Sequence, residues 1–331
     1  MNESTRTIAK NISALFVSQL TTWGLTLLLT IFLPRYLGPA HVGKLFLALS
    51  IWAIMVVVAG FGMDIFSTKE IARRPELAPR MIGQSLVARC FMFLLCAVAV
   101  AGYVVALDHP FELVVVVAII GISSLFDLLG RVFIAGFSGH EQMGFVSIGS
   151  VINRLVYTVL AFVMMYLGQG INQIALVHMF GSASSLAILT LFYVRRHDVE
   201  LSFNPGELLR LLRVSAPYLM SSLIVVAYNE VDKQIIAALL DERAVGYYAT
   251  AATLFSTVMF IPVVFSAALF PMMARSYSSS PDMLVTMNRK SLDLMFIVGI
   301  PVSLGIMAIA RPLVELVYGP EFAPAGAILS V

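Results

Sequence analysis

Long apolar stretches recur along this chain and constrain its fold more than any other feature. Nine runs of about twenty largely apolar residues lie near positions 11–33, 43–66, 84–107, 112–136, 145–168, 171–194, 214–240, 244–273 and 292–311. As an α-helix, a run of this length spans the roughly 30 Å of hydrocarbon in a bilayer. The sequence therefore predicts an all-α, polytopic transmembrane helical bundle.

The composition indicates a lipid rather than an aqueous environment. Of the 331 residues, 60% are hydrophobic and 12% are charged, whereas soluble domains carry about 25% charged residues. The net charge is only +2 and no long basic run is present, which argues against a nucleic-acid partner. The first run is uncharged over residues 12–33. It exceeds the roughly 7–15 residues of a signal-peptide core, so we interpret it as a retained span.

The positions of lysine and arginine predict the orientation. With a cytoplasmic N-terminus, fifteen basic residues, Arg89 among them, fall on the cytoplasmic side, against four on the outer side. Because basic residues accumulate in cytoplasmic segments, this bias favours a multi-pass protein of the inner cell membrane with its N-terminus in the cytoplasm. A tenth apolar run begins near Phe322 and ends with the chain at Val331. We therefore expect a fragment or a truncated form.

Two segments resemble each other at a nearly constant offset. LGPAHVGKLFLA from Leu37 aligns with LDERAVGYYATA from Leu240. The identical pairs are Leu37/Leu240, Val42/Val245, Gly43/Gly246 and Ala48/Ala251, followed by Ala72–Arg73/Ala274–Arg275 and Ser85–Leu86/Ser291–Leu292. Chance similarity between apolar helices is one explanation. The other is a repeated six-helix unit, whose two copies share one membrane orientation and face a central cavity.

We adopt the repeat as the prediction for the fold. It gives two six-helix lobes related by a pseudo-two-fold axis along the membrane normal, with the second lobe incomplete. Residues 1–200 form the N-terminal lobe, and residues 201–331 form a truncated C-terminal lobe of about three and a half spans.

Several short motifs also resemble one protein family in their order and spacing. They are Tyr36-Leu-Gly-Pro-Ala-His-Val-Gly43, Gly60-Phe-Gly-Met-Asp64 with Thr68-Lys-Glu-Ile-Ala-Arg73, Asn229-Glu-Val-Asp-Lys233 with Val245-Gly-Tyr-Tyr248, and Tyr318-Gly-Pro-Glu-Phe322. They look like the polysaccharide, or O-antigen type, flippases of the multidrug/oligosaccharidyl-lipid/polysaccharide exporter superfamily.

The resemblance implies a function in cell-surface polysaccharide biosynthesis. The expected cargo is a lipid-linked oligosaccharide, a glycan on a polyprenyl diphosphate, moved from the cytoplasmic to the outer leaflet by alternating access. The implied partners are this cargo, membrane lipids, a polysaccharide polymerase and its assembly proteins, with Na+ or H+ as the coupling ion. A cation-coupled exporter of small drugs and a non-transporting scaffold of a polysaccharide assembly complex are the alternatives.

Charged residues inside apolar spans mark candidate sites, because a charge at the bilayer centre costs about 2.5–3.5 kcal/mol on insertion scales. Asn153 and Arg154 lie near the middle of span 145–168. The planar guanidinium of Arg154 suits a phosphate of the cargo. The alternative is a structural pair between Arg154 and an acid such as Asp127.

Two further groups of polar residues are candidates for substrate binding. Asp127 and Arg131 are spaced i,i+4 on one helix, where they either line the cavity wall or neutralise each other. The second group, in span 214–240, contains Asn229, Glu230, Asp232 and Lys233. It is either an ion-coupling or sugar-contacting site, or a structural ion network between the lobes.

The first span carries a polar stripe that begins at Gln19 and includes Thr22, Thr26 and Thr30. It either lines the cavity or mediates helix packing. Asp64, at the end of the second run beside Lys69, we interpret as a simple interfacial charge.

No sequence motif indicates an enzyme, a cofactor or a metal site. The sequence contains no H-E-x-x-H, P-loop or G-x-S-x-G motif, and the two cysteines, Cys90 and Cys96, predict neither a disulfide framework nor a metal site. A membrane-embedded glycosyltransferase would need a large polar outer loop, and the predicted outer loops are short. We therefore predict a transporter without catalytic residues or cofactors.

Overall fold

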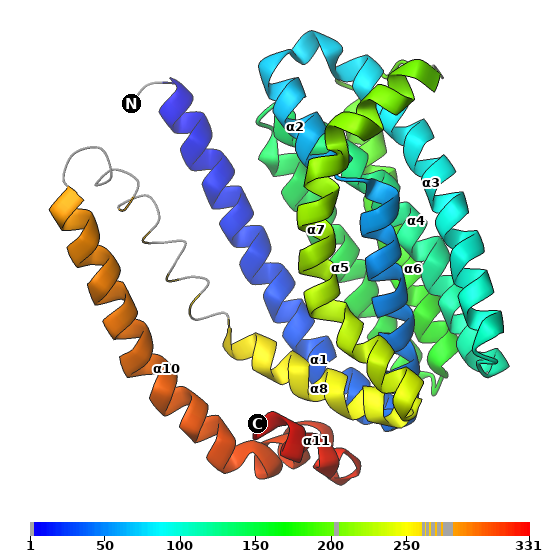
Figure 1. Cartoon of the computed structure of the whole chain (residues 1–331), viewed down its shortest axis with the longest axis vertical. Coiled ribbons are helices and arrows are strands. Elements are labelled where there is room, and N and C mark those ends of the chain that lie inside the picture. The colour runs from blue at the N-terminus through cyan, green and yellow to red at the C-terminus, as the bar shows by residue number, and fades with distance from the viewer. Residues whose placement is uncertain are drawn as a thin grey trace.

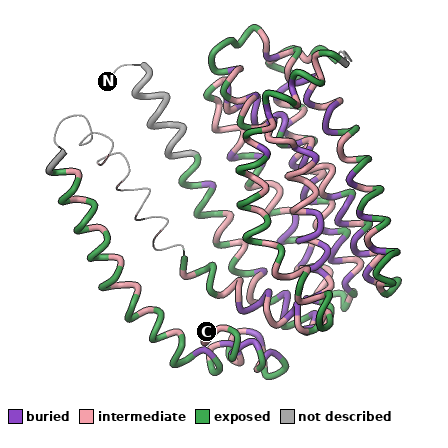
Figure 2. Tube along the Cα trace, in the orientation of Figure 1, coloured by how far each residue is buried: buried purple, intermediate pink, exposed green. Residues whose placement is uncertain are grey.

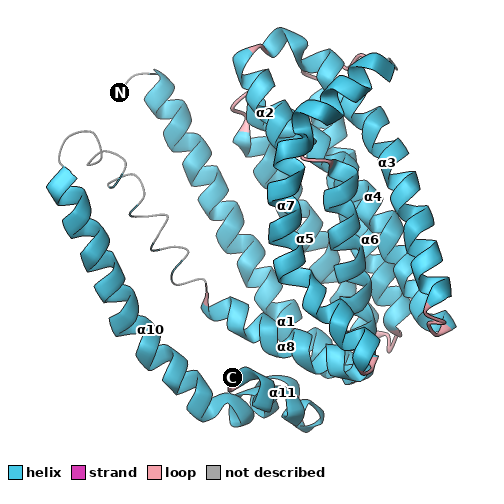
Figure 3. Ribbon diagram, viewed as in Figure 1, coloured by secondary structure: helices cyan, strands magenta, loops and turns pink. Residues whose placement is uncertain are grey.

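A computed structural model describes residues 3–201, 205–259 and 281–331, together with the single positions 262, 265, 269 and 273. Side chains of residues 3–14 are not part of this description. The described elements are helices, without strands (Figure 3). The prediction of an all-α bundle is confirmed.

The described helices follow one another with short connections, as Figure 1 shows. They are α1 (Glu3–Gly60), α2 (Met63–Arg73), η1 (Pro75–Leu77), α3 (Ala78–Ala106), α4 (Phe111–Gly139), α5 (Met143–Tyr166), α6 (Ile171–Val194), α7 (Pro205–Leu239), α8 (Glu242–Val258), α10 (Pro281–Tyr318), η2 (Pro320–Phe322) and α11 (Ala323–Leu329).

Among the described residues, seven helices are long and apolar enough to cross a membrane. Together they cover every predicted span except 244–273. The first half of that span forms α8, which ends at Val258, and most of the remainder, like Ala274–Arg275 of the repeat, lies outside the described residues. Helix α1 contains the first two predicted spans, joined at Gly38, where φ is 72°. Glycine adopts this left-handed backbone without steric cost.

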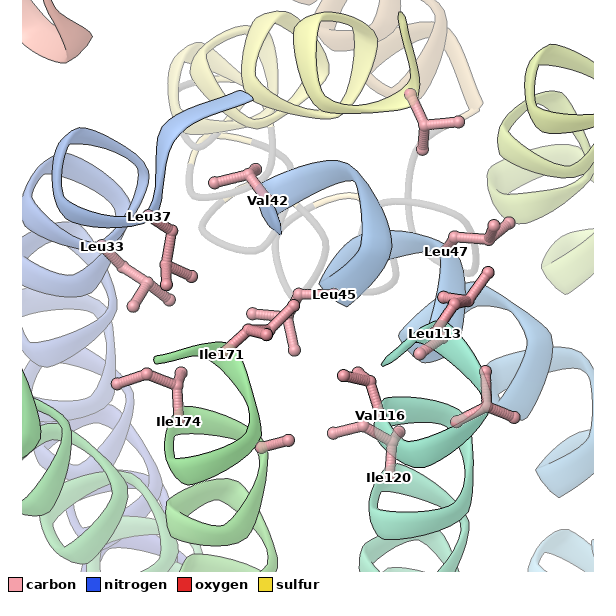
Figure 4. Close-up of a cluster of buried hydrophobic side chains, with 14 of the residues drawn as sticks. Leu33, Leu37, Val42, Leu45, Leu47, Leu113, Val116, Ile120, Ile171 and Ile174 are labelled. Atoms are coloured by element: carbon pink, nitrogen blue, oxygen red, sulfur yellow. The ribbon is translucent and has the colours of Figure 1, made fainter. Parts of the chain in front are cut away.

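A core of aliphatic side chains holds the first six predicted spans together. Figure 4 shows Leu45, from the second half of α1, beside Ile171 of α6, with Val116 of α4 close by. Trp52 crosses the same region: its indole Nε1 donates to the carbonyl of Val117 at 2.8 Å. Trp52 also stacks on Phe93, with a ring separation of 5.1 Å. The second half of α1 is therefore the central packing element of the predicted N-terminal lobe.

The repeat-related glycines meet each other across the two halves of the chain. A methyl group added at Gly43 would collide with the carbonyl of Glu242 and lie 2.9 Å from the nitrogen of Gly246. A methyl group at Gly246 would collide with the carbonyl of Pro39 and lie 3.1 Å from the nitrogen of Gly43. Pro39 and Glu242 occupy equivalent positions in the repeat, as do Gly43 and Gly246. Each glycine therefore contacts the equivalents of the residues that the other glycine contacts. Reciprocal contact of this kind is what a two-fold axis between α1 and α8 produces.

The remaining helices differ in how much of their surface is covered by protein. Helix α7 packs against α1 and α2. Helix α10 lies apart from the main bundle in Figure 1, and Figure 2 shows it exposed or half-buried along most of its length. Its apolar side chains, such as Phe296 and Leu304, are suited to lipid, because hydrocarbon carries no penalty for an exposed apolar face.

The glycine contact generates a prediction about stability. Substitution Gly246→Ala places a methyl group against backbone atoms, which cannot rotate away. Overpacking of this kind costs about 1–3 kcal/mol, so we expect a lower midpoint of thermal unfolding in detergent. Gly102→Ala is the matched control, because nothing described lies within 4 Å of its added methyl group. Equal unfolding midpoints for the two variants would contradict the proposed contact.

Candidate functional site

A cavity of about 960 Å³ opens among the helices of the predicted N-terminal lobe. Five elements line it, namely α1, α2, α4, α5 and α6. Its polar and charged lining residues are Gln19, Thr22, Thr26, Asp64, Thr68, Lys69, Asp127, Arg131, Ser138, Ser150, Asn153, Arg154, Ser182 and Ser185.

Arg154 lies in this cavity without a carboxylate partner. Its Nε donates to the hydroxyl of Thr26 at 2.7 Å, and its guanidinium carbon lies 6.0 Å from the ring centre of Tyr157. Among the residues that the structure describes, no carboxylate lies within 4.0 Å of it. The sequence-based alternative, a direct pair with Asp127, is therefore wrong. The Nη groups remain available to an anion.

Asp127 is held by neutral groups on two neighbouring helices. The amide nitrogen of Asn153 lies 3.4 Å from its Oδ1, and Ser182 of α6 lies close enough to interact with the carboxylate. Ser123 extends this chain: its hydroxyl donates to Ser182 at 3.0 Å and lies 2.8 Å from Nδ1 of His178. The network joins α4, α5 and α6 on the side of the cavity that Asp127, Asn153 and Ser182 line.

Arg131 forms a different ion pair from the one that the helical spacing suggested. It lies 3.9 Å from Asp64 of α2, whereas no ion pair joins Arg131 and Asp127 in the described part of the chain. The i,i+4 spacing placed both side chains on one face, and both line the cavity. Arg131 thus makes its direct ion pair with Asp64 of the facing helix, while it interacts with Asp127 only through longer-range charge attraction.

Sequence reasoning missed the buried side chain of Arg89 and misjudged Asp64. Arg89 is fully buried within α3, although we had counted it among the cytoplasmic charges. Its Nη2 pairs with the carboxylate of Asp64, and its Nη1 donates to the carbonyl of Leu128 at 2.8 Å. Asp64 is thus an ion-pair centre for two arginines, not an isolated interfacial charge. The sequence signal nearest to Asp64 was Gly62, which adopts a φ of 70° at the start of α2.

The predicted group in α7 lies away from the large cavity. Lys233 pairs with Glu230 at 2.9 Å and donates to the carbonyl of Asn229 at 2.9 Å. Asp232 accepts a hydrogen bond from the hydroxyl of Tyr248 on α8. The structure therefore brings Gln19, Asp127, Arg131, Asn153 and Arg154 together around one cavity, but not Asn229, Glu230, Asp232 and Lys233.

Beyond Arg154 lies a smaller chamber of about 220 Å³. Its walls combine both predicted lobes, because Leu45, Tyr157 and His178 face it together with Thr250, Thr253 and Tyr318. Thr26 and Arg154 line the chamber as well as the large cavity. The predicted cavity between lobes is thus the small chamber, whereas the larger polar cavity lies within residues 19–189.

The described part of the chain contains no group of three or more histidine, cysteine, aspartate or glutamate side chains that could hold a metal ion. What the cavity offers is a set of fixed hydrogen-bond donors and acceptors with one guanidinium free of acid. This arrangement suits binding of a polar, anionic group.

Comparisons with solved structures identify the fold. An inward-facing multidrug resistance MATE family transporter of the MOP superfamily matches at a TM-score of 0.63 and 19% identity, covering 97% of this chain and 78% of that chain. A MOP superfamily transporter from Pyrococcus furiosus, described as having a binding pocket of reverse polarity that suggests a different function, matches at 0.60 and 17%, covering 97% and 76%.

A third structure is the MATE transporter VcmN of Vibrio cholerae in its bent form, at a TM-score of 0.54 and 13% identity, covering 98% of this chain and 80% of that chain. MATE transporters have two lobes of six helices. No curated protein matches the sequence significantly.

The sequence itself matches a family model over most of its length. The model is that of the polysaccharide biosynthesis proteins, and the match covers residues 8–277. Together with the helical architecture, this shows that the chain belongs to the polysaccharide biosynthesis protein family and has the fold of the MOP superfamily transporters.

Proposed function

We propose that this multi-pass membrane transporter moves a lipid-linked oligosaccharide, a glycan carried on a polyprenyl diphosphate, from the cytoplasmic to the outer leaflet. The observation that carries the proposal is Arg154. It is a guanidinium inside the bundle, held by the hydroxyl of Thr26 and by no described carboxylate. A charge in the membrane needs a partner, and the anionic group of the cargo is the proposed partner of Arg154.

The charge of the cavity lining supports an anionic cargo. Three cationic side chains line it, those of Lys69, Arg131 and Arg154, against the carboxylates of Asp64 and Asp127. Asp64 is already paired with Arg131 and with Arg89, which is buried and does not line the cavity. A diphosphate carries negative charge and pairs of oxygens on each phosphorus, and the planar arginine fork binds such a pair with two parallel hydrogen bonds.

The size and the remaining lining suit the glycan. At about 960 Å³, the cavity is at the upper end of the roughly 300–1,000 Å³ of small-molecule pockets. Serine, threonine, asparagine and glutamine side chains such as Gln19, Ser150 and Asn153 offer neutral hydrogen-bond partners to sugar hydroxyls. In this proposal the polyprenyl tail stays in the lipid beside the bundle.

The two cavities share lining residues, which supports a proposed route through the protein. Arg154 and Thr26 separate the large cavity from the chamber shared by both predicted lobes. We propose that the route is used by alternating access, in which relative movement of the lobes widens the chamber and closes the large cavity. Na+ or H+ is the proposed coupling ion, and a polysaccharide polymerase with its assembly proteins is the proposed partner for the delivered cargo.

A cation-coupled drug exporter is the second candidate, and the similarity to MATE transporters favours it. Asp127 is the observation on its side, because its carboxylate contacts only neutral groups directly. The excess of cationic side chains in the lining argues against a cationic drug. A scaffold without transport activity has no use for a polar cavity of this size.

The Arg154 proposal predicts the effect of a single substitution. A hydrogen bond to a charged group contributes about 1.5–3 kcal/mol, so Arg154→Gln should lower the rate of flipping by roughly 10- to 100-fold. The rate is measured in reconstituted vesicles with a fluorescent polyprenyl-diphosphate oligosaccharide. Arg154→Lys keeps the charge without the planar fork. Its flipping rate should lie between those of the wild type and Arg154→Gln.

The control for this measurement is Arg195→Gln, which removes an exposed arginine that lines neither cavity. We expect it to flip the cargo like the wild type. Thermal unfolding of each variant checks that the loss does not come from misfolding. Flipping by a folded Arg154→Gln variant at the wild-type rate would remove the anion contact, and export of a cationic dye in place of the glycan would favour the drug exporter.

The orientation yields a separate prediction. With Arg89 removed from the count because it is buried, basic residues still favour a cytoplasmic N-terminus. Gly170, directly before α6, then lies at the outer face, and Asp198, four residues after its end, lies in the cytoplasm; both positions are exposed. In a background without Cys90 and Cys96, we expect Gly170→Cys in intact cells to react with a membrane-impermeant thiol reagent. Asp198→Cys should react only after permeabilisation, and the reverse pattern would invert the topology.

A further inference from the structure

A third cavity, separate from the large cavity and the small chamber, lies at the same end of the molecule as Asp64 and Lys69, on the outside of the bundle. It has a volume of about 570 Å³ and lies between the corner formed by α2, η1 and α3 and the first turns of α7. It is lined by Phe66, Glu70, Arg74, Leu77, Arg80, Met81, Gln84, Glu207, Arg210, Leu211 and Val214. None of these residues lines the large cavity, so the two are separate.

The lining of this cavity is amphipathic. An apolar wall is formed by Phe66, Leu77, Met81, Leu211 and Val214. The charged lining residues come from the end of α2, from α3 and from α7. The segment from Glu207 to Arg213 has the alternation of charged and apolar residues typical of a helix at a membrane interface. In the structure it is the first part of α7 and is continuous with the span that follows. The cavity is therefore placed where headgroups meet hydrocarbon.

The carboxylates of the cavity are already occupied. Glu207 accepts hydrogen bonds from Arg80 and from the side-chain amide of Gln84. Glu70 lies 3.8 Å from Arg74, the residue that follows α2, and the side chain of Arg74 remains 65% exposed. An exposed i,i+4 pair of this length holds the guanidinium only weakly.

Arg210 is left without an acid. In the described part of the chain no carboxylate lies within 4.0 Å of it, and its side chain is exposed at the cavity edge. With three arginines against two glutamates, the cavity has an excess of positive charge beside an apolar wall. A long arginine side chain in this position lays its stem on apolar surface and places its charge at the headgroup level.

We propose that this cavity binds an anionic phospholipid of the surrounding membrane. The phosphate lies between Arg74 and Arg210 and supplies their counter-charge. One acyl chain follows the apolar wall of Phe66, Leu211 and Val214. Basic pockets between membrane helices are suited to anionic headgroups. Arginine binds phosphate oxygens with paired hydrogen bonds. The proposal does not depend on the identity of the transported cargo.

The position of the cavity gives the lipid a structural consequence. Its walls come from α2 and α3 of the predicted N-terminal lobe and from α7 of the predicted C-terminal lobe. A lipid that contacts both sides binds this arrangement of helices better than one in which α7 has moved away. Such a ligand stabilises the conformation that it fits.

The test uses the whole chain in a neutral detergent, with phosphatidylglycerol and phosphatidylcholine added in turn. Native mass spectrometry measures lipid binding, and thermal unfolding measures stabilisation. We expect phosphatidylglycerol to bind at least tenfold more tightly than phosphatidylcholine and to raise the unfolding midpoint. The variant Arg74→Gln/Arg210→Gln should lose at least tenfold in phosphatidylglycerol affinity. Arg195→Gln, which removes an exposed arginine outside this cavity, should bind phosphatidylglycerol like the wild type.

Three results would overturn the proposal. The first is equal binding of the two lipids, and the second is unchanged phosphatidylglycerol binding by a folded double variant. The third is full displacement of phosphatidylglycerol by inorganic phosphate or by the lipid-linked oligosaccharide, which would assign the arginines to a free anion or to the cargo. Both lipid measurements are independent of the flipping assay, so a failure of the flippase proposal leaves them unaffected.

Discussion

The cost of a charge in hydrocarbon is the constraint on which the rest of this structure depends. A buried arginine is tolerated only where carboxylates or carbonyls satisfy it. Arg89 meets most of this condition through Asp64 and the carbonyl of Leu128, although its Nε has no hydrogen-bond partner among the described residues, and it holds α2, α3 and α4 together. Arg154 meets it only in part, because its described polar contact is a threonine hydroxyl. The first arginine is structural, and in the proposed function the second receives its counter-charge from the cargo.

Local periodicity explains how much of the site was predictable from the sequence. Gln19, Thr22 and Thr26 share a helical stripe, and so do Ser150 and Arg154, because side chains three or four residues apart on a helix lie on one face. The sequence therefore predicted which residues line the cavity from α1, α4 and α5. The pairing of Asp64 with Arg89 and Arg131 was not predictable in this way, because it depends on how three separate helices pack.

The repeat was predictable, but the location of the main cavity was not. Identical residues at Gly43/Gly246 and Val42/Val245 indicated two equivalent helices, and both valines are buried. Equivalence says nothing about how closely the helices approach. Because neither glycine carries a side chain, α1 and α8 come into close backbone contact, and a chamber of about 220 Å³ is lined by residues of both predicted lobes. The cavity of about 960 Å³ is lined by residues of the predicted N-terminal lobe.

This backbone contact also bears on the proposed transport cycle. Gly43 follows the kink of α1 at Gly38, and Gly246 lies near the start of α8. In the proposed orientation both are near the outer face, so their contact would close the proposed route on that side. Contacts between small residues depend on close packing and bury little side-chain area. Separating them therefore exposes little new apolar surface, and lipid can cover what is exposed. Farther in, Arg154 must exchange the hydroxyl of Thr26 for another acceptor before the chamber and the large cavity join, and a cargo phosphate is an acceptor of higher charge. In the proposed cycle, the cargo would itself favour the rearrangement that lets it pass.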